Sequence, residues 1–95
     1  MARFSREEIE EIDRLWRAVP ETHVWTGWAA AGEAPIEVWI FRTQAHWRRF
    51  PLRKTDDGRY ALHIETGRKV ADADTLKALL ERVEAIPGLK VIEGG

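Results

Sequence analysis

Apolar residues recur at three- and four-residue intervals near the start of the chain, at positions Ile9, Ile12, Leu15, Trp16 and Val19. This interval gathers them into one stripe, so the pattern predicts a helix over about residues 6–18. Ser5 and Glu8 have the spacing of a capping box, in which each side chain accepts a hydrogen bond from the other residue's backbone N–H. Pro20 ends the helix, because proline has no N–H for the helical ladder.

The middle of the chain changes to a pattern that is typical of strands. Residues 22–30 are rich in aromatic and β-branched side chains and predict a first strand. Residues 36–43 predict a second strand, with apolar side chains on both of its faces. A third strand is expected over about residues 46–54, where Pro51 indicates a bulge or an edge position because it cannot donate to a ladder.

The turn at residues 55–59 can be assigned from side-chain parity, because the length of a hairpin loop fixes which residues face each other. A two-residue loop at Asp57 and Gly58 would scatter the apolar side chains over both faces of the hairpin. A three-residue loop with Gly58 in the left-handed conformation instead pairs Leu52 with Leu62. This register gathers one apolar face from Phe50, Leu52, Tyr60, Leu62 and Ile64. We therefore predict a type I turn with a glycine bulge.

A second helix is predicted after Gly67, with Asp72 or Asp74 as its N-cap. Its buried stripe consists of Leu76, Leu79, Leu80, Val83 and Ile86. Pro87 and Gly88 end it, and residues 89–92 suit a short edge strand. The order of helix, three antiparallel strands and helix predicts one α+β domain over residues 1–95, with two layers and a three-stranded sheet.

Charge is unevenly distributed along a chain whose formal net charge is only -1. Residues 42–70 hold eight bases and three acids, whereas the segments on either side are acidic. The bases are Arg42, Arg48, Arg49, Arg53, Lys54, Arg59, Arg68 and Lys69. Such a basic segment is typical of an anion-binding surface, and equally of exposed strands protected by Lys and Arg. Both interpretations stay open on the sequence alone.

Catalytic and cofactor chemistry has little support in this sequence. There is no cysteine, and the single serine, Ser5, is already used as a helix cap. The three histidines, His23, His46 and His63, lie on different predicted strands without the short spacing of a metal motif, so we expect no metal site. No phosphate-binding glycine loop is present. We therefore expect a protein that is not an enzyme and holds no cofactor.

The location of the protein is also constrained by its apolar runs. None of them approaches the roughly 20 apolar residues that a membrane-spanning helix needs. The N-terminus is charged from Arg3 onwards and lacks the apolar core of a secretory signal. We expect a cytoplasmic protein without membrane contacts.

Tryptophan carries the stronger functional signal, since four of the five tryptophans fall on predicted strands. Side chains at odd and even positions of a strand point to opposite faces of the sheet. This alternation puts Trp25 and Trp28 on different faces, and likewise Trp39 and Ile40, so at least two indoles are expected on the sheet face opposite the main core. Two helices cover one face of a three-stranded sheet but not both. The residues expected to form a binding face are Trp25, Trp39, Trp47, Arg48, Arg49, Arg53 and His63.

Three alternatives for the second face remain open at this point. The sheet can bury both faces within one chain, through a helix on each side or strong curvature. Aromatic residues and arginine are enriched at interface centres, which favours a protein partner: a second copy in a homodimer, or the target of an inhibitor or regulatory subunit. Single-stranded nucleic acid is the third, with indoles stacking on bases and arginines neutralising phosphates. We prefer the protein partner and keep nucleic acid as the alternative.

The order of the predicted elements is similar to that of double-stranded RNA-binding domains. In that family the second helix begins with a lysine-rich segment that binds phosphates. The corresponding segment here, residues 69–74, contains Asp72 and Asp74, which would repel a phosphate backbone. The resemblance therefore concerns topology alone and assigns no function.

Overall fold

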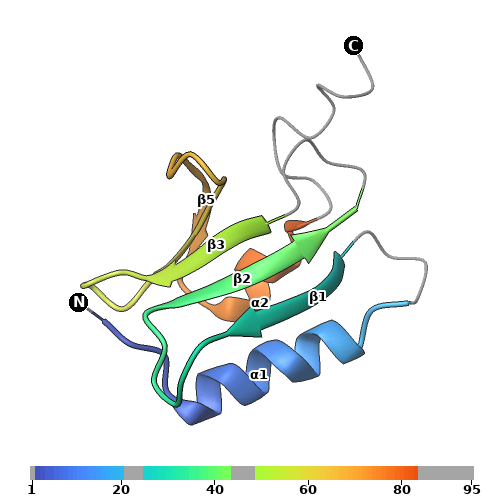
Figure 1. Cartoon of the computed structure of the whole chain (residues 1–95), viewed down its shortest axis with the longest axis horizontal. Helices are drawn as coiled ribbons and strands as arrows, with labels where there is room; N and C mark the ends of the chain where they lie inside the picture. The colour runs from blue at the N-terminus through green and yellow to red at the C-terminus, as the bar shows by residue number, and fades with distance from the viewer. Residues whose placement is uncertain (1, 21–24, 44–48, 84–95) are drawn as a thin grey trace.

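The computed structural model describes residues 2–20, 25–43 and 49–83 (Figure 1). Helix α1 (Arg6–Arg17) precedes the strands β1 (Trp25–Ala30), β2 (Glu37–Arg42), β3 (Arg49–Lys54), β4 (Tyr60–His63) and β5 (Lys69–Ala73), and α2 (Leu76–Leu80) follows them. The strands form one antiparallel sheet in the order β1-β2-β3-β4-β5. The α+β class is therefore confirmed. The prediction of a three-stranded sheet is wrong, because the described residues form a sheet of five strands.

Helix α1 begins with the capping box that the sequence predicts. The Ser5 backbone N–H donates to Glu8 Oε1 at 2.7 Å, and the Glu8 N–H donates to Ser5 Oγ at 3.2 Å. Its apolar stripe faces the core, where Ile12 is fully buried. Just before the helix, Phe4 is also buried and its N–H donates to the Pro35 carbonyl at 2.8 Å. These contacts fix the N-terminal end of α1 against the sheet.

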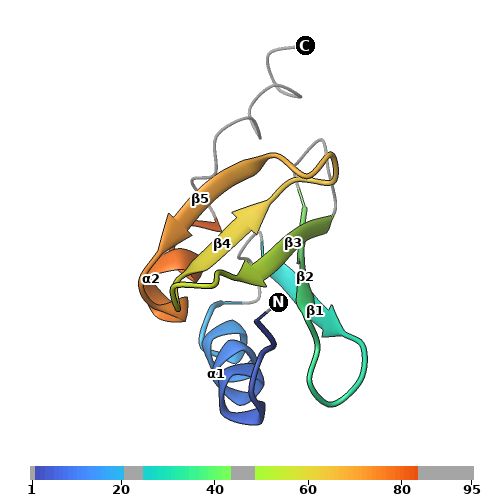
Figure 2. The same ribbon diagram turned by 90° about the vertical axis from the view of Figure 1, so that its left-hand side faces the viewer.

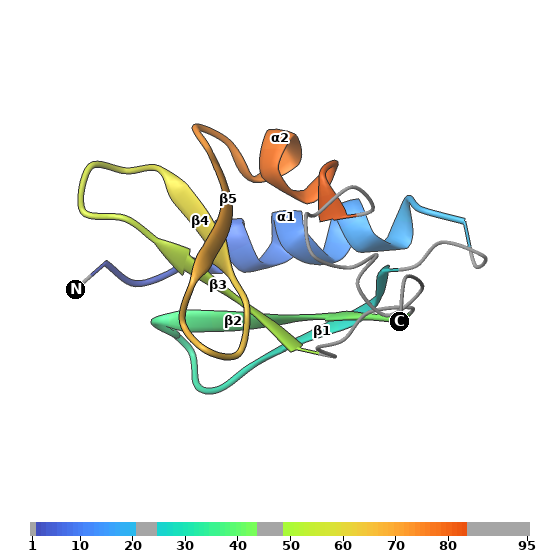
Figure 3. The ribbon, with the colours of Figure 1, turned by 90° about the horizontal axis from the view of Figure 1, so that it is seen from above.

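Both helices lie on the same side of the sheet, as Figures 2 and 3 show. Cross-strand partners share a face of a sheet, so the pairing of the strands assigns each side chain to one face. One such row consists of Ala30, Val38, Leu52, Leu62 and Ala71, and the two leucines and the valine are fully buried. Helix α2 adds Leu76, Leu79 and Leu80 to the same core. The sheet thus has one face against α1 and α2 and one face over which the described residues place no helix.

Two glycine turns of the same geometry build the second half of the sheet. In the first, Thr55 and Arg59 pair across three loop residues, and Gly58 has a φ of 83°. Leu52 faces Leu62, as predicted from parity. The second turn spans residues 64–68, where Ile64 N–H donates to the Arg68 carbonyl and Gly67 has a φ of 95°. This second hairpin produces β5, which the sequence analysis missed.

Pro51 lies in the central strand of the sheet, and the register with β2 runs through it without a shift, so neither the edge position nor the bulge expected for it is found. It pairs with Trp39 of β2, whereas the ladder between β3 and β4 runs only from Leu52 to Lys54. A proline has no N–H to extend that ladder. Pro51 is therefore accommodated where the pairing with β4 ends.

The start of α2 differs from the prediction. Thr75 is the N-cap, and its side chain accepts a hydrogen bond from the Ala78 N–H at 3.1 Å. Asp72 lies in β5 and Asp74 follows the strand, so neither aspartate caps the helix. The predicted helix end at Pro87 and Gly88 and the short strand over residues 89–92 lie outside the described residues. Within residues 2–20, 25–43 and 49–83, no helix is long and apolar enough to cross a membrane.

Candidate functional site

The face of the sheet that points away from both helices combines aromatic and charged side chains. We call it the outer face and define it by the register as Gly27, Ala29, Glu37, Trp39, Phe41, Arg49, Pro51, Arg53, Ala61, His63, Lys69 and Asp72. Its central row runs from Ala29 through Trp39 to Pro51. On this face β1 contributes the small residues Gly27 and Ala29, and β2 contributes Trp39 in the central row.

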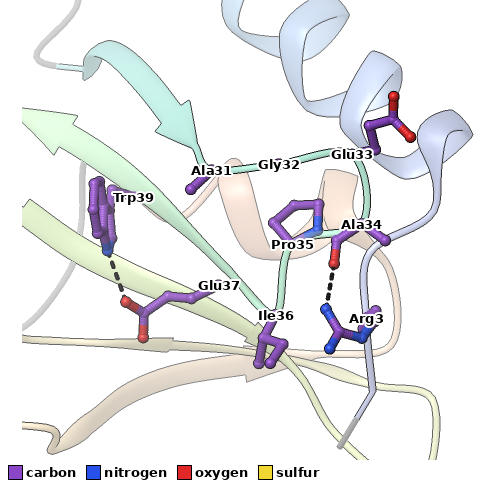
Figure 4. Close-up of a pocket in the computed structure, with 9 residues that line it drawn as sticks. All are labelled: Arg3, Ala31, Gly32, Glu33, Ala34, Pro35, Ile36, Glu37 and Trp39. Carbon is purple, nitrogen blue, oxygen red and sulfur yellow. Dashed lines mark hydrogen bonds between the residues drawn. The ribbon is translucent and has the colours of Figure 1, made fainter.

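Trp39 is held in place by one acidic and one basic side chain. Its indole Nε1 donates to Glu37 Oε2 at 2.7 Å (Figure 4). The guanidinium of Arg49 lies over the indole ring, 5.0 Å from its centroid, which is a cation–π contact. Trp39 is half-buried, whereas Arg49 is exposed. The pair therefore presents a partly apolar and positively charged surface.

Glu37 links Trp39 to a second arginine. Its other carboxylate oxygen, Oε1, accepts from Arg53 Nε and Nη2, both at 2.8 Å. Burial raises the pKa of Glu37, but the hydrogen bonds from Trp39 and Arg53 outweigh it and bring the pKa below the ordinary value of 4.5. Glu37 is therefore ionised at neutral pH. Its negative charge neutralises Arg53 and leaves Arg49 as the cation of this group.

His63 and Phe41 complete the polar and aromatic surroundings of Trp39. His63 is half-buried, and its Nδ1 lies 3.3 Å from the carbonyl oxygen of Pro51. Phe41 is also half-buried and faces Arg49 across the β2–β3 ladder. Glu37, Phe41 and Pro51 were not among the candidates from the sequence. The alternation of residues 37, 39 and 41 along β2 was the signal that places the first two beside Trp39.

Trp25 does not belong to the outer face, which corrects the prediction from parity. Thr26 is an extra residue in β1, because Trp25 faces Arg42 while Gly27 faces Phe41. This β-bulge turns Trp25 and Trp28 to the same side of the sheet. Trp25 is only 3% exposed in the core, and Trp28 Nε1 donates to Asp13 of α1 at 3.1 Å. Among the strand tryptophans that the structure describes, Trp39 alone points outward.

A hollow of about 400 Å³ adjoins one end of the outer face. The connection between β1 and β2, from Ala31 to Ile36, forms most of its wall, and Arg3, Glu37 and Trp39 complete it (Figure 4). Arg3 is fixed by a hydrogen bond from its Nη1 to the Ala34 carbonyl at 2.8 Å. The hollow thus offers a side-chain-sized recess next to the Trp39–Glu37 pair.

Much of the basic segment over residues 42–70 is neutralised by acids from other parts of the chain. Ion pairs join Arg53 to Glu37, Lys54 to Glu8, Arg59 to Asp72 and Asp74, and Lys69 to Asp72. Arg42 is buried, and its Nη1 donates to the Val83 carbonyl in the core. Arg49 and Arg68 form no ion pair with any residue that the structure describes. The excess of positive charge seen along the sequence is therefore smaller on the surface.

Two of the predicted site residues, Trp47 and Arg48, lie outside the described residues, as do His23 and His46. Of the others, the structure brings Trp39, Arg49, Arg53 and His63 together on the outer face and places Trp25 in the core. No three metal-ligating side chains approach one another within the described ranges.

Comparisons of this chain with protein-family models, with curated proteins and with solved structures gave no match.

Proposed function

We propose that this chain is a non-enzymatic protein-binding domain that uses its outer face to engage another protein. The Trp39–Arg49 pair carries this proposal, because it combines an aromatic ring with a cation that has no acidic partner among the described residues. Tryptophan and arginine are the residue types that most often dominate the binding energy of interfaces. Neither α1 nor α2 covers this face, and Arg49 is exposed while Trp39 is half-buried.

Charge indicates the chemistry of the partner. Arg53 is already paired with Glu37, whereas the Arg49 guanidinium lies over the ring of Trp39 and forms no ion pair with a described residue. A partner that places a carboxylate beside Arg49 gains a charge-assisted hydrogen bond without breaking an existing pair. The aromatic side chains around it favour an apolar contact area. The expected partner is thus an apolar protein surface that carries an acidic residue.

Nucleic acid is less well supported than a protein. Base stacking needs an accessible ring face, and the Arg49 guanidinium already occupies one face of Trp39. Four bases of residues 42–70 are paired with carboxylates, so fewer cations remain for phosphates. These contacts favour the protein partner as the working hypothesis.

A site-specific photo-crosslinker identifies the partner and tests the proposal. Benzoylphenylalanine replaces Phe41 on the outer face or, as the matched control, Glu10 on the exposed side of α1. We expect the variant at position 41 to form a defined adduct with a protein of the native host, and the variant at position 10 to form none. The purified adduct partner should bind the wild type and lose about thirtyfold in affinity with Trp39→Ala, as for a hot-spot aromatic residue.

Three results would contradict the proposal in its present form. One is an adduct partner that binds Trp39→Ala as tightly as the wild type. The second is an adduct that consists of two copies of this chain, which would make the outer face a homodimer interface. The third is a nuclease-sensitive adduct, together with oligonucleotide binding that Arg49→Glu abolishes at low salt.

A further inference from the structure

The two edges of the sheet differ in how they are protected. Strand β5 carries Lys69 and Asp72, and charged side chains discourage the addition of another strand. Strand β1 has the sequence WTGWAA and contains no charged residue and no proline. An uncharged edge strand is a template for pairing with another extended chain. The β1 edge is therefore the side of the sheet at which a further strand is chemically accepted.

Pro51 determines which backbone groups of β1 face outward. It has no N–H, so its pair with Trp39 can only be one in which the two residues do not bond each other. The N–H and C=O of Trp39 consequently point to β1, where Trp39 faces Ala29. Alternation then turns the N–H and C=O of Trp28 and Ala30 away from β2. These two residues supply donors and acceptors at the two-residue spacing that an added strand requires.

A second feature at the same edge is suited to a side chain. A hollow of about 330 Å³ lies between the end of α1 and the start of β1. Its walls are formed by Trp16, Arg17, Val19, Pro20, Trp25 and Thr26, and most of these are apolar. A strand that pairs with Trp28 and Ala30 reaches the bulge at Thr26, which lies at the wall of this hollow. Strand addition with a pocket for an alternate side chain is an established mode of peptide recognition.

The position of α1 selects the kind of chain that fits. Figures 1 and 2 both show that α1 lies close to the β1 edge of the sheet. A second copy that paired its β1 with this β1 would also bring its own α1 close to the α1 of the first copy, and the two helices would compete for the same space. A single extended segment carries no helix and avoids this conflict. The geometry favours a lone peptide over a symmetric dimer.

We infer that the β1 edge binds an extended segment of a partner protein as a sixth strand, with an apolar side chain of that segment in the hollow beside Trp16 and Val19. This site is separate from the outer face, since it uses the backbone of β1 and the end of α1. The inference does not depend on the proposed role of Trp39.

Random peptides of about seven residues, the length of a strand, are displayed on phage and selected on the wild-type protein. Counter-selection uses Ala30→Pro, which removes one outward N–H and leaves the bonds to β2 intact. We expect enriched peptides with apolar residues at alternate positions. A synthetic peptide of the enriched sequence should bind the wild type, Ala30→Ser and Trp39→Ala alike, and roughly tenfold more weakly to Ala30→Pro.

Amide NMR shifts of the wild type give a readout that does not depend on the proline variant folding. The synthetic peptide should shift the Trp28 and Ala30 amides most, and it should shift the outer-face residue Arg53 little. The inference is overturned if no peptide is enriched, if Ala30→Pro binds with unchanged affinity, or if the shifts centre on Trp39. It is also overturned if the β1 amides become protected by dimer formation on concentrating the protein alone, because a second copy would then be the occupant. Loss of peptide binding with retained Phe41 crosslinking would reject this site and leave the outer-face proposal standing.

Discussion

Glu8 illustrates how one side chain serves both local and tertiary structure. In the capping box it accepts from the Ser5 N–H, and its carboxylate also accepts from Lys54 Nζ at 3.0 Å and from the Tyr60 hydroxyl. Burial raises the pKa of Glu8, but these hydrogen bonds outweigh it and hold the pKa below 4.5. Burial and the contact with Glu8 raise the pKa of Tyr60, which therefore stays a neutral donor. Glu8 thus joins the start of α1 to the β3–β4 hairpin.

The substitution Glu8→Gln should lower the free energy of unfolding at pH 7 by about 1.5–3 kcal/mol, since it removes charge-assisted hydrogen bonds. A carboxylate with a lowered pKa in the folded state stabilises the fold above its unfolded pKa and loses this effect as the pH falls through the folded value. The difference between wild type and variant should therefore be constant near neutral pH and shrink below pH 4.5. Urea unfolding across this pH range measures it.

Glu10→Gln is the matched control for this measurement. Glu10 is exposed and its contact with Arg6, at 3.5 Å, is a surface ion pair. Such pairs contribute about 0–1 kcal/mol, so the control should change stability little at any pH. Equal effects of the two substitutions would contradict the assigned role of Glu8.

At the scale of elements, two hairpins of the sheet are closed by the same kind of three-residue glycine turn. Residues 55–59 and 64–68 both place a glycine with positive φ just before the next strand. Parity assigned the first turn correctly because apolar residues flank it on both sides. After Arg68 the chain reads Lys-Val-Ala-Asp-Ala, which has little of the β-branched and aromatic character of a strand. Pairing with β4 stabilises β5 where local propensity does not.

Gly67→Ala tests the second turn directly. The φ of 95° is unfavourable for a residue with a Cβ, although the added Cβ would meet no atom within 4 Å. We expect a loss of about 1–2 kcal/mol in unfolding free energy from backbone strain alone. Asn tolerates this conformation better, so Gly67→Asn should lose less. Thermal unfolding of both variants provides the comparison, and an Ala variant as stable as the wild type would disprove the strained turn.

Across the whole molecule, the two faces of the sheet differ in their energetic roles. Phe50 is fully buried between the sheet and the helices, whereas Phe41 lies half-buried on the outer face. Removal of a buried phenylalanine costs about 3–5 kcal/mol, because the transfer free energy and the packing are both lost. A side chain at an interaction surface contributes less to the stability of the free domain.

Phe50→Ala should therefore lower the unfolding free energy by about 3–5 kcal/mol, and Phe41→Ala by about 1 kcal/mol or less. Denaturant unfolding of the two variants measures the difference. Similar losses for both would mean that the outer face is part of the folding core, and the surface proposed for binding would then be unsuitable.

The amino-acid sequence alone determined the local features of this protein. The Ser5–Glu8 cap, the helix from Arg6 and the three-residue turn at Gly58 all depend on neighbouring residues, whose spacing is visible in the chain. It also placed Trp39 on the outer face, since β2 alternates without interruption.

Only the tertiary structure decided which residues share a surface. The extra residue Thr26 reverses the alternation of β1 and turns Trp25 inward, and a bulge of one residue leaves no reliable mark in sequence periodicity. The charge of residues 42–70 likewise depended on acids that the fold brings from α1, β2 and the end of β5. Pairing between distant residues sets the free charge and the exposed faces, because both depend on contacts that no local pattern encodes.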